Sequence, residues 1–270
     1  MRVGFVGLGS QGGGMAERLI DQGVPTTLWA RRAESVEPFA GRCAVAADLV
    51  ELGRASDVVG ICVTDGAAVR EVVSGVLAGM ARGSVLAVHS TIGAAECAEI
   101  ASSAQATGVR VIDAPVSGGG AMAAAGRLTV YVGGADDVVG YARPMLETYG
   151  DPVLHMGPLG SGLRTKLVNN ALNASHFALA HDAMALGVAL GLDPVLLGDA
   201  LRNGSGRSYA LELFVALGSL APIAEHAGPI MAKDIGLFAQ ETGSDAELLL
   251  CAADRFLALL GHPRSPGHEP

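Results

Sequence analysis

The chain carries little charge, few aromatic residues and no excess of basic groups. Only 17% of its residues are charged and 4% are aromatic, and the formal net charge is -9. Without a basic excess the protein cannot neutralise a run of phosphates, which argues against a nucleic-acid partner. Any anionic ligand must therefore be met by a few positive groups placed locally.

Cysteine and histidine are also sparse, and neither forms a metal-binding pattern. The four cysteines, Cys43, Cys62, Cys97 and Cys251, lie far apart and include no CxxC pair. The seven histidines have no HxxxH or HExxH spacing. We therefore expect no metal site, and the cysteine usage is typical of a reduced, cytoplasmic protein.

Long uninterrupted apolar runs are missing as well. The longest apolar region, residues 170–192, is interrupted by Asn173, two histidines and Asp182, which disfavours a membrane span. The amino terminus enters a strand-like run at Val3, which leaves no room for a signal peptide. We expect a soluble protein without a membrane partner.

What the chain has in abundance is a repeated pattern of short valine-rich runs. Half of its residues are apolar and 38 are glycine, a balance that suits a compact enzyme. Strand-like runs, separated by helix-like stretches, occur at residues 3–6, 26–29, 58–63, 85–88, 109–112 and 129–132. Such alternation predicts an α/β fold with a mainly parallel sheet covered on both faces by helices.

After residue 157 the apolar residues follow a helical period instead. A helix over residues 161–190 would be roughly 45 Å long, enough to bridge two domains. Asp193-Pro194 predicts the start of the next helix, and glycines at 191, 204, 218 and 243 predict helix ends. We predict four segments: a sheet domain over 1–158, an interdomain helix over 159–190, an all-α domain over 191–262 and a mobile tail over 263–270.

The first strand-like run leads directly into a glycine-rich turn with G-x-G-x-x-G spacing. The turn consists of Gly7, Leu8, Gly9, Ser10, Gln11 and Gly12. Between a strand and a helix, the first glycine permits the turn, the second admits a pyrophosphate and the third lets the helix pack closely. These six residues therefore predict a Rossmann-type domain that binds a dinucleotide.

The end of the second strand indicates which dinucleotide is bound. NAD-preferring sites usually carry an acidic residue there, whereas this chain has Arg31 and Arg32. Guanidinium groups can pair with a 2′-phosphate, so we predict NADP as the preferred cofactor and NAD as the second choice. The alternative is that both arginines are solvated loop residues.

One lysine interrupts the apolar pattern of the long helix. Lys166, Asn170 and Asn173 are spaced by four and three residues, so they share one helical face. Their neighbours, among them Leu172 and Leu179, are mostly apolar, as in a buried helix. Burying an unpartnered ammonium is costly. Lys166 must therefore reach solvent or meet a group that uses its charge or its proton.

A second glycine-rich turn follows the strand that ends at Ile112. It runs from Asp113 to Gly120 and contains Ser117 and three consecutive glycines. Such a turn can present several backbone amides and a hydroxyl to one carboxylate or phosphate. The alternative is an ordinary flexible loop.

Together these segments resemble the β-hydroxyacid dehydrogenase family, which includes the 3-hydroxyisobutyrate dehydrogenases. The stretch 7–16 is similar to the family's cofactor signature, 113–119 to its substrate signature and 160–170 to its catalytic signature. The chain departs from the family at Gln11, where methionine is usual, and at Val88, where aspartate is frequent. The resemblance covers nearly the whole chain.

The resemblance implies a role for each motif. Lys166 would be the general acid or base and Asn170 would orient the substrate. The substrate carboxylate would be held by Ser117, Gly118 and Gly119. Thr91 and Lys233 would lie against the cofactor. Apart from what the resemblance implies, the predicted cofactor-binding residues also include Arg31, Arg32, Val63 and Thr64. The implied activity is hydride transfer between a nicotinamide cofactor and a small β-hydroxy acid or its semialdehyde, with Lys166 exchanging the proton.

Several alternatives stay open at this level. An imine reductase would generally place aspartate or tyrosine where this chain has Lys166, and a nucleotide-binding scaffold without catalysis would be expected to lose that lysine or the substrate glycines. The substrate's side chain would be recognised by helical residues such as Asn173, His176 and Tyr209. Asp182 is expected to be a satisfied structural carboxylate. The apolar helical half predicts a homodimer or a larger homo-oligomer.

Overall fold

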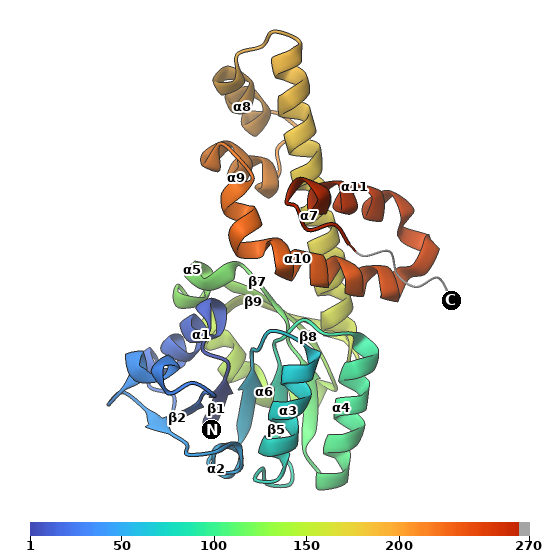
Figure 1. Ribbon diagram of the computed structural model, residues 1–270. Helices are drawn as coiled ribbons and strands as arrows, with labels where there is room; N and C mark the ends of the chain where they lie inside the picture. Colours follow the sequence, from blue (N-terminus) through green and yellow to red (C-terminus); the bar gives the residue numbers. More distant parts are fainter. Residues whose placement is uncertain (265–270) are drawn as a thin grey trace. The chain divides into compact units, whose positions relative to one another are not determined.

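The computed structural model describes residues 1–264 (Figure 1). The side chains of two residues inside this range, at positions 226 and 244, are left undescribed. The chain divides into two compact units, which meet in sequence between Lys166 and Leu167. This division falls inside a long helix, and the segment boundaries expected at 158, 190 and 262 stay predictions. Most of the expected mobile tail, residues 265–270, lies outside the described residues.

The first unit is built on one nine-stranded sheet with the order β3-β2-β1-β4-β5-β6-β8-β7, and β9 pairs with β8. Its strands are β1 Val3–Val6, β2 Thr26–Trp29, β3 Ala44–Val45, β4 Val58–Ile61, β5 Val85–Val88, β6 Arg110–Asp113, β7 Val116–Ser117, β8 Leu128–Gly133 and β9 Gly150–Gly157. The strands from β3 to β6 are parallel, whereas β8 runs antiparallel to β6 and β7. The predicted mainly parallel sheet is confirmed.

Six strands lie where the valine-rich runs predicted them, and three were missed. β3 and β7 contain only two residues each, too few to show a period, and β9 includes Asp151, Pro152 and His155, which break an apolar run. β9 lies at the end of the sheet, parallel to β8. Five of its eight residues are exposed, and they mix polar with apolar side chains, so no strand-like period shows.

Helices cover both faces of this sheet, as the pattern predicted (Figure 1). One face packs against α1 Ser10–Asp21, α5 Gly119–Ala124 and α6 Asp136–Tyr149. The other face packs against α2 Leu49–Arg54, α3 Gly66–Leu77 and α4 Ala94–Thr107. Burial on both faces explains why β1, β4 and β5 read as continuous apolar runs without alternation.

From residue 161 onward, the described residues form helices joined by loops and no strand, which confirms the predicted all-α part of the fold. Its helices are α7 Ser161–Ala189, α8 Pro194–Asn203, α9 Tyr209–Leu217, α10 Ala221–Thr242 and α11 Glu247–Leu259. Asp193 caps α8 by accepting hydrogen bonds from the amides of Val195 and Leu196, at 2.9 Å each. All four glycines predicted to mark helix ends lie just past a helix. The core of this unit includes a stacked pair, Phe177 and Phe256, with ring centroids 5.0 Å apart.

The apolar pattern of α7 indicated a buried helix, and this holds for only part of its surface. Leu167, Ala171 and Phe177 are buried, but Leu172 is 45% and Leu179 is 61% exposed. A helix that is apolar on most of its circumference need not face a core on all sides, because an apolar face can also be left for a partner. Within residues 1–264, no helix combines the length and the apolar character needed to cross a membrane.

Candidate functional site

The predicted cofactor residues of the first unit lie at the carboxyl ends of its parallel strands. The chain continues from β1 to β2 on one side, and β4 lies on the other side, so the sheet has a switch point between β1 and β4. Ligands of open α/β sheets bind outside the carboxyl ends of the strands at such a point. The glycine turn follows β1, Arg31 and Arg32 follow β2, and Val63 and Thr64 follow β4.

The three glycines of the turn have the conformations that a dinucleotide cradle requires. Gly7 has a φ of +96°, and a Cβ there would collide with the carbonyl of Cys62. A Cβ on Gly12 would collide with the carbonyl of Gly7, so the helix packs too closely for a side chain. Apart from its chain neighbours, no described residue places an atom within 4 Å of a Cβ built on Gly9. That open space is where a pyrophosphate would approach the backbone.

Arg31 and Arg32 are both exposed, and each is paired with a carboxylate. Arg31 Nη2 lies 2.5 Å from Glu71 Oε2, and Arg32 Nε lies 3.9 Å from Glu34 Oε1. Exposed pairs of this kind contribute little to stability. A 2′-phosphate could therefore displace Glu71 from Arg31 without a large loss in the free energy of folding.

The loop after β4 is shaped by a residue that follows β5. The backbone N–H of Val63 donates to Ser90 Oγ at 2.8 Å, and Ser90 is buried. Thr64 Oγ1 donates to Asp65 Oδ2 at 3.0 Å, and Asp65 caps α3 by accepting from the amide of Ala68. Thr91, next to Ser90, is half-buried. Val63, Thr64 and Thr91 are thus held on two neighbouring strand ends.

His89 connects the carboxyl ends of β5 and β6. Its Nδ1 lies 2.7 Å from the carbonyl oxygen of Ala114, and its Nε2 lies 3.1 Å from the hydroxyl of Tyr149. Because a carbonyl can only accept, Nδ1 carries the proton, and Nε2 accepts from the tyrosine hydroxyl. Burial lowers the pKa of His89 to about 4. The ring is therefore neutral near pH 7, and its role in the fold is to tie β5 to β6.

The predicted substrate turn lies beside the cofactor turn. Gly118 and Gly119 have φ values of +134° and +75°, which L side chains rarely adopt. A Cβ on Gly120 would lie 2.8 Å from the backbone oxygen of Ser10. The substrate turn, which ends at Gly120, and the cofactor turn, which includes Ser10 at the start of α1, therefore touch. Burial raises the pKa of the Tyr131 phenol, and a hydrogen bond with Ser117 opposes that rise.

Lys166 lies in the second turn of α7 and is half-buried. The start of this helix is attached to Asp113, whose Oδ1 and Oδ2 accept from the backbone N–H groups of Gly160 and Leu163, at 2.7 Å each. Asp113 is fully buried at the end of β6. The first turn of the helix that carries Lys166 is thereby fixed to the strand that leads into Ser117.

Asn170 is buried in the second unit, where its amide group has defined partners. Its Nδ2 donates to Asp234 Oδ2 at 2.6 Å, and its Oδ1 accepts from Asn169 Nδ2 at 3.1 Å. Asp234, 2% exposed, also forms an ion pair with Lys233, with Lys233 Nζ 3.0 Å from Asp234 Oδ1. Asp234 therefore connects two residues that the sequence predicted separately, Asn170 and Lys233.

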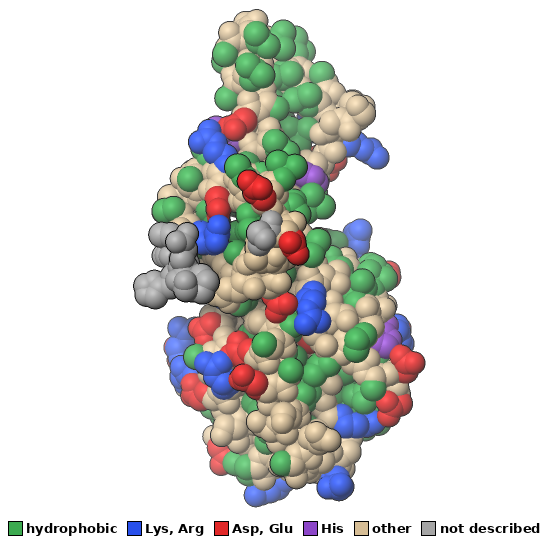
Figure 2. Space-filling view, turned by 90° about the vertical axis from the view of Figure 1, so that its right-hand side faces the viewer, with side chains coloured by type: hydrophobic (Ala, Val, Ile, Leu, Met, Phe, Trp, Pro, Cys, Tyr) green, Lys and Arg blue, Asp and Glu red, His purple; other side chains and the backbone are tan. Residues whose placement is uncertain are grey.

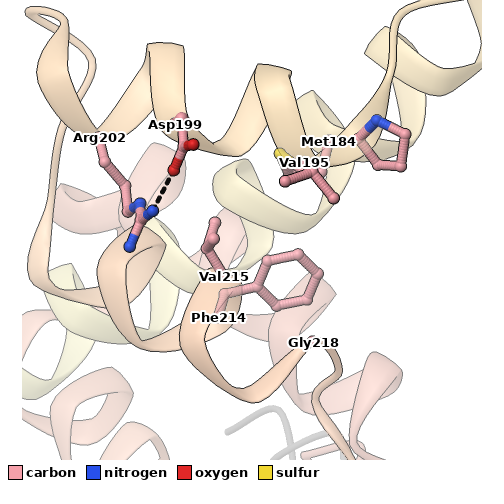
Figure 3. Close-up of a pocket in the computed structure, with 8 residues that line it drawn as sticks. Met184, Val195, Asp199, Arg202, Phe214, Val215 and Gly218 are labelled. Atoms are coloured by element: carbon pink, nitrogen blue, oxygen red, sulfur yellow. Dashed lines mark hydrogen bonds and ion pairs between the residues drawn. The ribbon is translucent and has the colours of Figure 1, made fainter.

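At least two hollows occur among the described residues of the helical unit. The one in Figure 3, of about 390 Å³, is lined by Met184, Phe214 and the paired Asp199 and Arg202, and by none of the predicted site residues. The other, of about 320 Å³, is lined by Asn173 and Tyr209 together with apolar side chains such as Phe177 and Met231. His176 does not line it. Two of the three residues predicted for substrate recognition thus border one apolar hollow.

His181 and Asp182 have structural contacts instead. Asp182 accepts hydrogen bonds from Arg255 at 3.1 and 3.4 Å and lies 2.9 Å from Nδ1 of His181. These contacts lower the pKa of the Asp182 carboxyl. The expectation of a satisfied structural carboxylate is confirmed.

Sequence reasoning assigned no role to Asp113, Asp234 or Tyr131. A signal existed for the first, since a carboxylate at the end of an apolar parallel strand must find several donors. Another signal is that the chain has just two lysines, Lys166 and Lys233, among its 18 Lys and Arg residues. Every other basic residue among the 18 is arginine, so Lys166 and Lys233 carry the only side-chain amines.

Comparisons with known proteins agree with the geometry of both units. Residues 2–157 match the NAD-binding domain of 6-phosphogluconate dehydrogenase, and residues 160–260 match the family described as NAD-binding of NADP-dependent 3-hydroxyisobutyrate dehydrogenase. The 2-(hydroxymethyl)glutarate dehydrogenase of Eubacterium barkeri is 32% identical over 258 residues, which cover 93% of this chain and 85% of the relative.

Two further relatives extend the likeness over most of the chain. The NAD-dependent L-serine dehydrogenase of Pseudomonas aeruginosa is 35% identical over 260 residues, which cover 89% of this chain and 84% of that enzyme. A solved structure of Mycobacterium tuberculosis 3-hydroxyisobutyrate dehydrogenase with L-serine aligns with a TM-score of 0.87 at 28% identity, covering 98% of this chain and 96% of that one. Because both parts of the chain match and relatives above 30% identity span most of its length, the protein belongs to the β-hydroxyacid dehydrogenase family of NAD(P)-dependent oxidoreductases.

Proposed function

We propose that the protein is an NADP-dependent dehydrogenase or reductase of a small β-hydroxy acid, with Lys166 as general acid and base. The observation that carries the proposal is the placement of Lys166 one helical turn before Asn170, whose amide is held by the buried Asp234. The relatives named above support the substrate class, since their substrates are hydroxy acids.

The cofactor would be held by the glycine turn and the strand ends around it. The amides that begin α1 and the open space at Gly9 suit a pyrophosphate, and Arg31 and Arg32 suit a 2′-phosphate. When bound, the nicotinamide supplies or accepts the hydride. Val63, Thr64 and Thr91 would border it from the neighbouring strand ends, and Lys233 is a further proposed contact.

The proton is the part of the reaction that this chain's own side chains would carry. In the reduction, the Lys166 ammonium donates a proton to the oxygen of the former carbonyl group. In the oxidation, the neutral amine accepts the hydroxyl proton. Ser117, Gly118 and Gly119 would hold the substrate carboxylate through a hydroxyl and backbone amides, and Asn170 would orient the reacting group.

The apolar hollow that Asn173 and Tyr209 border supports a small alkyl group on the substrate. Its other lining residues are almost all hydrophobic, and burying a methyl group there is favourable by about 0.8 kcal/mol. The corresponding substituent of L-serine is an ammonium group, which would have to leave water for the same apolar surroundings at a large cost. We therefore expect a larger kcat/KM for 3-hydroxyisobutyrate than for L-serine.

We also propose that the protein forms a homodimer or a larger homo-oligomer. Large apolar side chains, each more than half exposed, follow one another over the end of α7 and the start of α8: Leu179, Leu186, Leu190, Leu192, Val195 and Leu196. Figure 2 shows hydrophobic side chains gathered in the upper part of the view, where Figure 1 places these helices. Monomers rarely leave contiguous surfaces of this kind to water, and a second copy offers the same surface.

The test of the proposed function is a comparison of wild type with Lys166→Ala. Absorbance assays with NADPH and NADH over a panel of β-hydroxy acids, semialdehydes and imines should show turnover of one of the first two classes. Lys166→Ala should reduce kcat by about 10²- to 10⁴-fold, the usual contribution of a general acid or base. Its Kd for NADPH should be unchanged. Near-normal turnover in this variant would refute the role of Lys166, and turnover of imines alone would favour the imine reductase.

A further inference from the structure

The carboxylate of Asp113 takes the place of a capping side chain at the start of α7. The residue before this helix, Gly160, has a φ of +90° and no side chain that could accept a hydrogen bond. The first backbone N–H groups of a helix have no partner inside it, and the N-cap side chain usually supplies an acceptor. Here the acceptor is Asp113, 47 residues earlier in the chain than Gly160.

Both carboxylate oxygens of Asp113 accept hydrogen bonds from backbone donors. Gly160 N lies 2.7 Å from Oδ1 and Leu163 N lies 2.7 Å from Oδ2, and the N–H of Gly162 donates as well. Burial raises the pKa of Asp113, whereas these donors lower it. An ionised carboxylate can accept all of these bonds, but a carboxamide would turn its own N–H₂ toward a backbone N–H.

Two glycines make room for this arrangement. A Cβ on Gly162 would lie 2.8 Å from Asp113 Oδ2 and would collide with the carbonyl of Tyr131. A Cβ on Gly133, at the end of β8, would lie 2.9 Å from the carboxylate carbon of Asp113. The glycine at position 162 is therefore explained by the close approach of α7 to Asp113.

We propose that Asp113 is a positioning residue for Lys166. Asp113 begins the segment that continues into the turn of Ser117, Gly118 and Gly119, and Lys166 follows Gly162 by four residues, one turn along the helix. The carboxylate thus fixes the start of the substrate turn and the first turn of the Lys166 helix to each other. This inference rests on the proposed function, in which Lys166 moves the proton.

The direct test uses Asp113→Asn and Gly162→Ala, with Asp136→Asn as the matched control. Asp136 undergoes the same chemical change, but its side chain is 99% exposed. Asp113→Asn and Gly162→Ala should lower kcat by about tenfold or more, since misplacement of a reacting group by about 1 Å can cost 10²-fold. The KM for NADPH should stay within about twofold, because the cofactor turn keeps its contacts, and Asp136→Asn should behave as wild type.

A second measurement reports on Lys166 without any turnover. Competitive acetylation across a pH series gives the pKa of each amine, and the chain has only two lysines, so Lys233 serves as the internal reference. Asp113→Asn should lower the pKa of Lys166, because removing a negative charge disfavours the ammonium form. The pKa of Lys233 should be unchanged. A purely structural loss would alter both lysines or neither.

The outcomes separate this inference from the proposed function. If wild type turns over no compound of the panel, the proposed function fails, yet the labelling of Lys166 still supports or overturns the role of Asp113. Unchanged kcat and unchanged Lys166 labelling in Asp113→Asn would overturn it. If neither variant folds, amide hydrogen exchange of the wild-type protein tests the contacts of Asp113. The amides of Gly160 and Leu163 should exchange slowly if the Asp113 carboxylate accepts their hydrogen bonds, and fast exchange of both would overturn the inference.

Discussion

The side-chain amide of Asn170 donates to the buried carboxylate of Asp234 at 2.6 Å, 64 residues further along the chain. Because Oδ1 of Asn170 accepts from Asn169, the hydrogen bonds assign both ends of the amide group. Asp234 also pairs with Lys233. One carboxylate therefore orients a residue of α7 and neutralises a cation of α10.

The first prediction concerns this carboxylate. Asp234→Ala would leave the buried Asn170 without its acceptor and should lower the free energy of unfolding by about 2 kcal/mol. It should also lower kcat, since the orientation of Asn170 would no longer be fixed. Chemical denaturation and steady-state kinetics measure the two effects, with the exposed Asp199→Asn as the control. Unaltered kinetics would show that Asn170 keeps its orientation without Asp234.

The second prediction concerns the choice of cofactor. The double variant Arg31→Ala, Arg32→Ala should raise the KM for NADPH by about 10- to 100-fold, the loss expected for charge-assisted hydrogen bonds worth about 1.5–3 kcal/mol. The KM for NADH should hardly change. Arg42→Ala is the control, because it removes an exposed arginine that pairs with Glu17 and Asp21. It should leave the KM for NADPH and the KM for NADH unchanged.

The ion pair between Arg31 and Glu71 gives a third prediction, with the opposite sign. Glu71 competes with a 2′-phosphate for the guanidinium group of Arg31. Glu71→Gln should therefore lower the KM for NADPH without altering that for NADH, by a few-fold because the pair is exposed. A wild-type protein that prefers NADH at low cofactor concentration would contradict both this prediction and the preceding one.

The fourth prediction is a pH dependence of stability that originates in His89. Its pKa is about 4 in the folded protein, below the ordinary 6.5, so the unfolded chain binds more protons between these values. Stability is therefore lost as the pH falls from 6.5 to 4, by about 3 kcal/mol from this group alone. In the His89→Asn variant, this pH-dependent contribution to the free energy of unfolding should be absent. Urea unfolding of both proteins across the pH range measures the difference in slope, and equal slopes would show that His89 does not titrate in this way.

The fifth prediction concerns assembly. Leu186→Glu and Leu190→Glu each place a charge on the apolar surface at the end of α7, where both leucines are more than 60% exposed. Burying that charge in an interface is costly, so each variant should shift the protein toward the monomer in size-exclusion chromatography with light scattering. Leu248→Glu, at a position 84% exposed on α11, is the control and should keep the wild-type mass.

The local order of the chain could be predicted from its sequence because it depends on short-range physics. Valine-rich runs bounded by turns gave six of the strands, Asp193-Pro194 gave the start of α8, and glycines gave the helix ends. The strands of β3 and β7 could not be found in this way, since two residues carry no period. The exposed leucines of α7 could not be told from core residues, because a sequence shows which residues are apolar but not what covers them.

The sequence by itself determined the glycine turn, the arginines after β2 and the single lysine on an apolar helix. The glycine turn follows from local sterics, and the arginines and the lysine are identified by their charge beside apolar neighbours. Only the tertiary structure decided that Asp113 caps α7 and that Asp234 holds Asn170. Asp113 accepts from Gly160 across 47 residues of chain, and Asp234 accepts from Asn170 across 64. Such pairings arise because a buried charge must collect donors wherever the packed core places them.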